Sequence, residues 1–156
     1  MSFSPPRTRA VDGALFKIGI VAARFNEELV DGLLARVTTG LRAAGVKAGR
    51  IALARVPGSH EVPWAAQALA RRGCDCVIGL GVLIGGDTSH HELVGQSVSH
   101  ALQRVALDTR TPVINGVIVA DTRAQAVARC LGRINRGAEF AQAALAMAAL
   151  KRTLSR

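Results

Sequence analysis

Three short segments of the sequence combine side chains that can carry protons, accept hydrogen bonds or bind anions. They are RFN (24–26), PGSHE (57–61) and GGDTSHH (85–91). Each follows an apolar run of the kind that forms a buried strand. Because the carboxyl ends of parallel strands lie at one edge of a sheet, we expect the three segments to line one cleft.

The glycines of the third segment are candidates for a phosphate-binding loop. Gly85 and Gly86 precede a predicted helix, where backbone N–H groups and the partial positive charge of the helix N-terminus favour an anion. In the alternative interpretation the glycines only turn the chain, and Asp87 or Thr88 caps the helix. Both interpretations stay open here, since Asp87 would repel a phosphate if its side chain faced it.

Two histidines open the helix that follows this loop. An imidazole at His90 or His91 could transfer protons near neutral pH, as a general acid or base does. A zinc-protease helix is not expected, because HELVG (91–95) has glycine where the second histidine ligand would stand. His60 could approach in space, but we expect no metal site.

Four further residues each allow a binding role and a structural one. The ring of Phe25 could stack on a planar heterocycle or fill the core. The carboxylate of Glu61 could accept hydrogen bonds from sugar hydroxyls, or favour a helix N-terminus. Arg129 and Arg136 could each bind a phosphate in bidentate fashion, or belong to a solvated helix face.

The elements that must position these residues follow from hydrophobic periodicity. Apolar runs at 16–23, 51–56, 76–84 and 112–119 predict four buried strands. Helical spacing gives two apolar faces, made of Leu29, Val30, Leu33, Leu34, Val37 and Leu41, and of Leu93, Val94, Val98, Ala101, Leu102 and Val105.

Three more helices are predicted, at 62–71, 122–131 and 137–154. In the last of them we expect Phe140, Ala144, Met147 and Leu150 to pack inward. The predicted order βαβαβαβαα favours an α/β sandwich of three layers, in which a parallel four-stranded sheet has helices on both faces.

Length and composition indicate one domain. The 156 residues, 49% of them hydrophobic, are read as a tail over 1–13 followed by a single domain over 14–156. No run is long and apolar enough for a membrane span, and the N-terminal segment lacks a signal-peptide core. Three cysteines, an odd number, indicate reduced thiols in a cytoplasmic protein.

The net charge of +9 favours anionic ligands. Nucleic acid is not the partner we expect, because the arginines are scattered and aromatic residues make up only 3% of the chain. We expect no membrane partner either. The charge by itself does not identify the anion.

Six motifs, taken together, resemble the lumazine synthase family in order and spacing over residues 16–150. They are RFN, VPGSHEVP (56–63), GxxIxGxTxH (81–90), PVINGV (112–117), DTxxQAxxR (121–129) and NRGAE (135–139). The resemblance implies a flavodoxin-like fold and no bound cofactor or metal. It also implies the condensation of 5-amino-6-ribitylaminouracil with 3,4-dihydroxy-2-butanone 4-phosphate to 6,7-dimethyl-8-ribityllumazine, phosphate and water.

The same resemblance implies roles for individual residues. His90 would move protons. The substrate's pyrimidine and ribityl parts would meet Phe25, Asn26, Ser59, His60, Glu61, Asn115 and main-chain groups near Val82, Leu83 and Ile84. The phosphate would meet Gly86, Asp87, Thr88, Arg129 and Arg136, with Arg129 reaching across from a neighbouring subunit.

The chain departs from the family at a few of these places. The family usually has arginine at position 85, an apolar or aromatic residue at position 60 and an aromatic at position 91, where this chain has Gly85, His60 and His91. Asn115 replaces a common phenylalanine and Arg136 a lysine. The first three departures support the alternative of a catalytically weak lumazine- or flavin-binding protein on the same scaffold.

The resemblance further implies a homopentamer, or a multiple of it such as a decamer or an icosahedral shell. The N-terminal tail would then be loose or docked on a neighbouring subunit. A basic assembly protein that attracts polyanions is a third interpretation, but it gives no reason for the six motifs to coincide.

Overall fold

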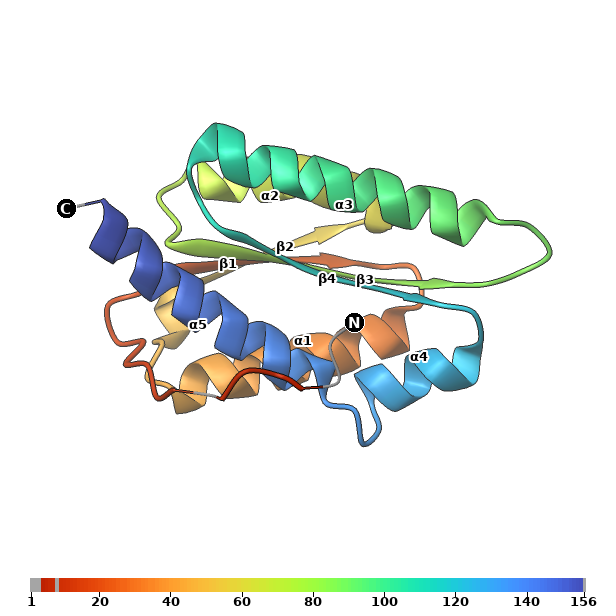
Figure 1. Ribbon diagram of the computed structural model, residues 1–156, viewed down its shortest axis with the longest axis horizontal. Coiled ribbons are helices and arrows are strands. Elements are labelled where there is room, and N and C mark those ends of the chain that lie inside the picture. Colours follow the sequence, from red (N-terminus) through yellow and green to blue (C-terminus); the bar gives the residue numbers. More distant parts are fainter. Residues whose placement is uncertain (1–3, 8, 156) are drawn as a thin grey trace.

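The computed structural model describes residues 4–7 and 9–155, and they form an α/β sandwich of three layers (Figure 1). The strands are β1 (Ile18–Ala23), β2 (Ile51–Val56), β3 (Cys76–Ile84) and β4 (Val113–Ala120). The helices are α1 (Glu27–Ala43), α2 (Val62–Ala70), α3 (His90–Thr109), α4 (Arg123–Cys130) and α5 (Arg136–Leu154), with short 3-10 turns η1 (Ala48–Arg50) and η2 (Ser59–Glu61).

All neighbouring strands are parallel, in the order β2-β1-β3-β4. Helices α1, α4 and α5 cover one face of the sheet, and α2 and α3 cover the other (Figure 1). The predicted order of elements and the flavodoxin-like arrangement are therefore confirmed. Within the part of the chain that the structure describes, no helix is long and apolar enough to cross a membrane.

The sheet is buried in its middle and partly exposed at its edges. Every residue of β1 is buried, because β1 has strands on both sides and helices on both faces. Alternate side chains feed the two cores: Ile18 and Ile20 pack toward α1 and α5, and Val21 packs toward α2 and α3. The prediction of four buried strands is wrong for the edge strands, where Leu53 and Val119 are exposed.

The inner faces of the helices agree only in part with the predicted ones. Leu33 and Val37 of α1 are fully buried, as expected, whereas Leu93 of α3 is exposed. In α5 the prediction is right for Phe140 and Ala144 and wrong for Met147 and Leu150, which are exposed. The apolar residues of α5 are spread over all sides of the helix, so periodicity could not select its inner face. The buried side chains are Phe140, Ala141, Ala144, Leu145 and Ala148.

The cysteines are free thiols inside the cores. Burial raises the pKa of Cys74, that of Cys76 to about 12 and that of Cys130 to about 11. These thiols are protonated at neutral pH and have little nucleophilic character.

The segment before β1 contacts its own chain. The N–H of Gly13 donates to the main-chain oxygen of Ala44 over 2.8 Å, and Val11 packs against the core beside α1. Residues 1–3 and 8, which belong to the predicted tail, lie outside the described residues. Docking of the tail on a neighbouring subunit stays a prediction.

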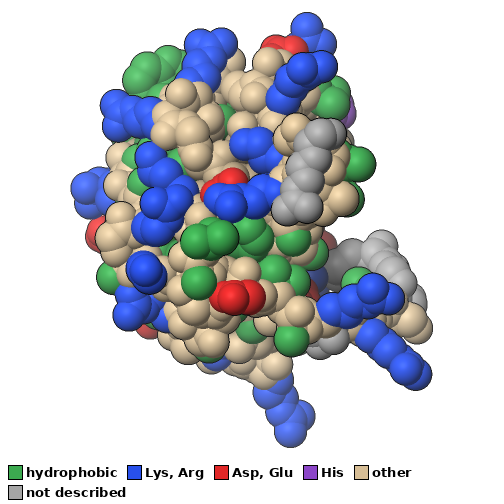
Figure 2. Space-filling view, turned by 90° about the vertical axis from the view of Figure 1, so that its left-hand side faces the viewer, with side chains coloured by type: hydrophobic (Ala, Val, Ile, Leu, Met, Phe, Trp, Pro, Cys, Tyr) green, Lys and Arg blue, Asp and Glu red, His purple; other side chains and the backbone are tan. Residues whose placement is uncertain are grey.

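The amino ends of the strands form a strongly basic face. Figure 2 views the molecule from this end, where Lys and Arg side chains crowd the surface. Between β1 and α5 the carboxylate of Asp75 accepts hydrogen bonds from the Lys17 amide and from Arg152. The segments singled out for chemistry lie at the opposite end of the sheet (Figure 1).

Candidate active site

The loop after β1 is joined to the ends of two other strands. The amides of Arg24 and Phe25 both donate to the main-chain oxygen of Pro57, which follows β2. Asn26 begins α1 with a left-handed backbone (φ 56°, ψ 48°), and its Nδ2 donates to the main-chain oxygen of Val82 over 2.8 Å. RFN and PGSHE therefore meet beside β3.

The turn at PGSHE is held by its own carboxylate. Oε2 of Glu61 accepts the Gly58 amide over 2.9 Å, which closes the short η2 turn. The Ser59 side chain is buried over Gly81, where a Cβ atom would overlap its hydroxyl. Gly81 is therefore needed for the close approach of η2 to β3. His60, in the middle of the turn, is exposed.

The ring of Phe25 lies on the surface beside this turn. Phe25 is 72% exposed, and a Cβ on Gly58 would lie 3.1 Å from its Cδ2. The interpretation that Phe25 fills the core is therefore wrong, and the ring is free to stack on a ligand. We call Phe25, Asn26, Ser59, Glu61 and the Val82 main chain the Phe25 cluster.

Strand β3 offers backbone groups to this cluster. The pairing of β3 with β1 ends at Leu80, whereas its pairing with β4 continues to Ile84. On the β1 side, the main-chain oxygen of Val82 accepts a hydrogen bond from the Asn26 side chain. On the β4 side, the Gly85 amide donates to the main-chain oxygen of Ala120. Since the N–H and C=O groups of successive residues point to opposite sides of a strand, those of Leu83 point toward β4. Those of Ile84 point toward the β1 side, where no strand pairs with them.

The loop between β3 and α3 leaves its amides available. Within the described part of the chain, no backbone N–H of residues 86–89 donates a hydrogen bond. Ser89 begins α3 without a side-chain cap, and Oγ1 of Thr88 accepts the His90 amide over a long 3.4 Å. Capping by Asp87 is not observed. Free amides at a helix N-terminus are an arrangement that binds anions.

The two neighbouring histidines face different surroundings. His90 is exposed at the first position of α3. The side chain of His91 is only 11% exposed, with Nε2 3.6 Å from Oδ1 of Asp121 at the end of β4. Sequence reasoning missed this pairing, because Asp121 lies 30 residues away on another strand end.

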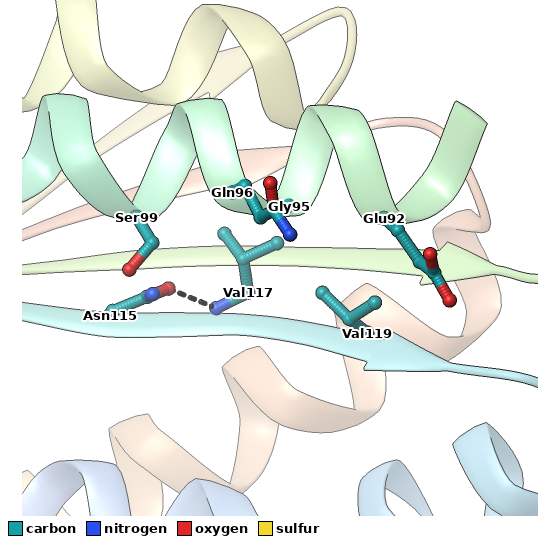
Figure 3. A pocket seen from close by; sticks show the side chains of 7 residues that line it. All are labelled: Glu92, Gly95, Gln96, Ser99, Asn115, Val117 and Val119. Atoms are coloured by element: carbon teal, nitrogen blue, oxygen red, sulfur yellow. Dashed lines mark hydrogen bonds between the residues drawn. The ribbon is translucent and has the colours of Figure 1, made fainter. Parts of the chain in front are cut away.

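Asn115 lies away from the Phe25 cluster, on the edge strand. Its Oδ1 accepts the Val117 amide over 3.0 Å. Figure 3 shows Asn115 in an open groove of about 370 Å³ between β4 and α3, whose other lining residues are Glu92, Gly95, Gln96, Ser99, Val117 and Val119.

Both candidate phosphate-binding arginines also follow β4. A guanidinium N–H of Arg129 donates to the Gln125 oxygen of its own helix, and Arg136 pairs with Glu139 and lies 5.2 Å from the centroid of the Phe140 ring. Strand β3 separates β4 from β1 in the sheet. The candidate residues of one chain therefore form two groups, one at β1, β2 and β3 and one along β4, α4 and α5.

Comparison with known proteins gives consistent matches over nearly the whole chain. A family model described as 6,7-dimethyl-8-ribityllumazine synthase matches residues 15–152. The protein of that name from Paracidovorax citrulli is 42% identical over 146 residues, which are 93% of each chain. Those from Leifsonia xyli and Pyrococcus furiosus, with the same name, are 40% and 39% identical and cover 97% and 91% of this chain, and 96% and 89% of their own.

Proposed function

The chain belongs to the 6,7-dimethyl-8-ribityllumazine synthase family, and on that premise we propose how its residues carry out the family's reaction. It is a transferase of riboflavin biosynthesis that condenses 5-amino-6-ribitylaminouracil with 3,4-dihydroxy-2-butanone 4-phosphate. The products are 6,7-dimethyl-8-ribityllumazine, phosphate and water. Beyond the departures at Gly85, His60 and His91, no observation on the described residues favours the alternative of a catalytically weak binding protein.

The Phe25 cluster is the proposed site for the aminouracil. The observation that carries this assignment is the exposed ring of Phe25 next to Asn26, whose side chain bonds β3 beyond the end of its pairing with β1. The pyrimidine would stack on the ring while the main chain of Ile84 bonds its polar edge. The hydroxyl of Ser59 would donate or accept hydrogen bonds along the ribityl chain and the carboxylate of Glu61 would accept them, with exposed His60 at the rim.

The free amides of residues 86–89 are the proposed site for the phosphate of the second substrate. The N-terminus of α3 adds partial positive charge to these amides. His90 follows them as the first residue of α3, and its imidazole would reach a substrate bound between the loop and the Phe25 cluster. We assign it the proton transfers of imine formation, phosphate elimination and ring closure.

Holding the two substrates together accounts for most of the proposed rate enhancement. Orientation of two reactants contributes roughly 7 to 11 kcal/mol in favourable cases. One acid–base group contributes about 10²- to 10⁴-fold in rate, which is a smaller share. We therefore propose that the site acts mainly by orienting the two substrates, with proton transfer by His90 as a smaller contribution.

A ring of subunits would bring the two groups of residues together. At the β2 edge Leu53 is 51% exposed, and Trp64 of the neighbouring helix α2 is 77% exposed. At the other edge Val119 and Leu93 are exposed. Contact between such unlike edges is heterologous, and heterologous contacts form a closed ring when the rotation between neighbours closes. We propose a homopentamer, or a multiple of it such as a decamer or an icosahedral shell.

In that ring, the active site would be shared between neighbours. Arg129 and Arg136 of one subunit would bind the phosphate near the Phe25 cluster of the next, and Asn115 would line the same junction. A cytoplasmic location is the one we expect, in keeping with three free cysteines.

Mixed assemblies test the shared site directly. The variants His90→Ala and Arg129→Ala are unfolded together, refolded as hybrids and assayed for lumazine formation by its absorbance. If the two residues act from different subunits, hybrids contain sites with both residues intact, and activity rises above that of either variant alone. Arg133→Ala, which changes an exposed arginine of the α4–α5 connection, is the matched control and keeps full activity.

Two results would contradict the proposal. Hybrids no more active than the mean of the separately refolded variants would mean that His90 and Arg129 serve the same subunit's site. Absence of saturable acceleration by the unaltered, folded oligomer, compared with the uncatalysed reaction, would reject the catalytic assignment itself.

A further inference from the structure

The imidazole of His91 has no hydrogen-bond partner within the described residues. Both of its ring nitrogens are buried, although the side chain stands in the first turn of a helix at the surface. A buried polar group without a partner costs free energy, so such a group calls for a ligand or an ion.

Two carboxylates stand beside this imidazole. Glu92 follows it in α3, and Asp121 comes from the end of β4. One ligand atom of each of the three residues lies within 4.8 Å of the other two. Figure 3 shows the Glu92 carboxylate beyond Val119, near the end of β4.

The spacing of the His91 and Asp121 ligand atoms suits a metal ion. The separation between Nε2 of His91 and Oδ1 of Asp121 is 3.6 Å, too long for a hydrogen bond. Ligand atoms about 2.1 Å from a zinc ion and at a tetrahedral angle lie about 3.4 Å apart. The pair therefore needs little adjustment to coordinate one ion.

The charge around this cluster also favours a cation. The chain has a net charge of +9, yet no Lys or Arg of the described residues forms an ion pair with Glu92 or Asp121. At position 85 a Cβ atom would lie 2.5 Å from the Asp121 main-chain oxygen, so glycine permits the close approach there and adds no cationic side chain beside this carboxylate.

We propose that His91, Glu92 and Asp121 bind a divalent first-row transition-metal ion, with Zn²⁺ as the best match to one imidazole and two carboxylates. A water molecule would complete four-coordination. The spacing of HELVG could not indicate such a site, because the third ligand comes from another element. The ion would cross-link the first turn of α3 to the end of β4, a role that does not depend on the proposed catalytic assignments.

Calorimetric titration of the tag-free oligomer with Zn²⁺ at pH 7 tests this site. We expect one ion per chain, and binding at least about 10-fold weaker in His91→Phe and in Asp121→Asn. Zn²⁺ should also raise the melting temperature of the unaltered protein and not that of either variant. His100→Phe, which changes an exposed histidine of the same helix, is the matched control and should bind as the unaltered protein does.

The proposal is overturned if the unaltered protein shows no saturable binding, or if the Asp121→Asn variant binds Zn²⁺ as tightly as it does. Asp121 is exposed, so Asp121→Asn decides the question even if His91→Phe fails to fold. Catalytic activity is not part of the readout, so failure of the active-site proposal would leave the result unaffected.

Discussion

Asn26 and Val82 are joined by a 2.8 Å hydrogen bond that reaches from the loop after β1 to β3, beyond the point where these strands pair. The bond holds the loop that carries Phe25 against β3, the strand whose main chain is proposed to hydrogen-bond the pyrimidine. Asn26 also has a left-handed backbone, which only glycine and short polar residues adopt readily. Two separable physical effects therefore act at one residue.

Substitutions at Asn26 should separate these effects. Asn26→Gly loses the hydrogen bond but tolerates the backbone, and should lower the free energy of unfolding by about 1 kcal/mol. Asn26→Ala loses the bond and strains the backbone, and should lower it by about 2 to 3 kcal/mol. Urea denaturation at equal subunit concentration measures both. Equal losses would show that the left-handed conformation carries no cost.

Removal of the His90 imidazole should slow lumazine formation without stopping it. We expect kcat of His90→Ala to fall by no more than about 10²- to 10⁴-fold, because substrate positioning survives. His100→Ala, on the same helix, should be unchanged. Complete loss of turnover in a folded His90→Ala oligomer would mean that proton transfer, not positioning, dominates.

The adjacent glycines of the phosphate loop should differ in their tolerance of a methyl group. A Cβ at Gly85 would overlap the Asp121 main chain, whereas one at Gly86 would meet nothing within 4 Å. We expect Gly85→Ala to destabilise the fold by about 1 to 3 kcal/mol, as overpacking does. Gly86→Ala should be close to neutral in thermal unfolding. The reverse order would contradict the observed path of the loop.

Stability should depend on pH through Asp75. Burial raises the pKa of this carboxyl, but hydrogen bonds from Arg152 and the Lys17 amide, with the charges of Arg152 and Lys151, outweigh burial and lower the pKa below its usual value. A lowered folded-state pKa stabilises the fold at neutral pH, and this contribution is lost as the pH falls below about 4.

Asp75→Asn should accordingly reduce the free energy of unfolding by roughly 1 to 3 kcal/mol at pH 7. The difference from the unaltered protein should shrink in acid, as urea denaturation at pH 7 and pH 3.5 can measure. Asp108→Asn is the control, because its pair with Arg104 is exposed and contributes little. An Asp75→Asn effect that is the same at both pH values would exclude the ionised carboxylate as its source.

The elements were predictable because their signals are local. Isoleucine- and valine-rich runs and helical spacing in α1 follow from a few neighbouring residues. The inner face of α5 was not predictable, since Met147 and Leu150 are as apolar as the buried Leu145. What differs is which side meets α1 and the sheet, and that is a tertiary property.

Much the same holds for the site. The loops of Phe25 and Ser59 could be expected together because both follow neighbouring strands. The inward turn of His91 toward Asp121 could not, because it depends on the pairing of β3 with β4, which places Asp121 near the start of α3. Nor could the separation of Asn115 from Phe25, which the strand order determines.

The outward position of Trp64 makes its fluorescence sensitive to association between subunits. It is the single tryptophan of the sequence, and it stands on α2, three residues after Glu61. In a separated subunit its indole is exposed to solvent and should fluoresce at long wavelength. A neighbour that covers α2 would shift the emission to the blue, so that dilution of the oligomer, monitored by fluorescence alone, reads out how tightly the subunits hold together.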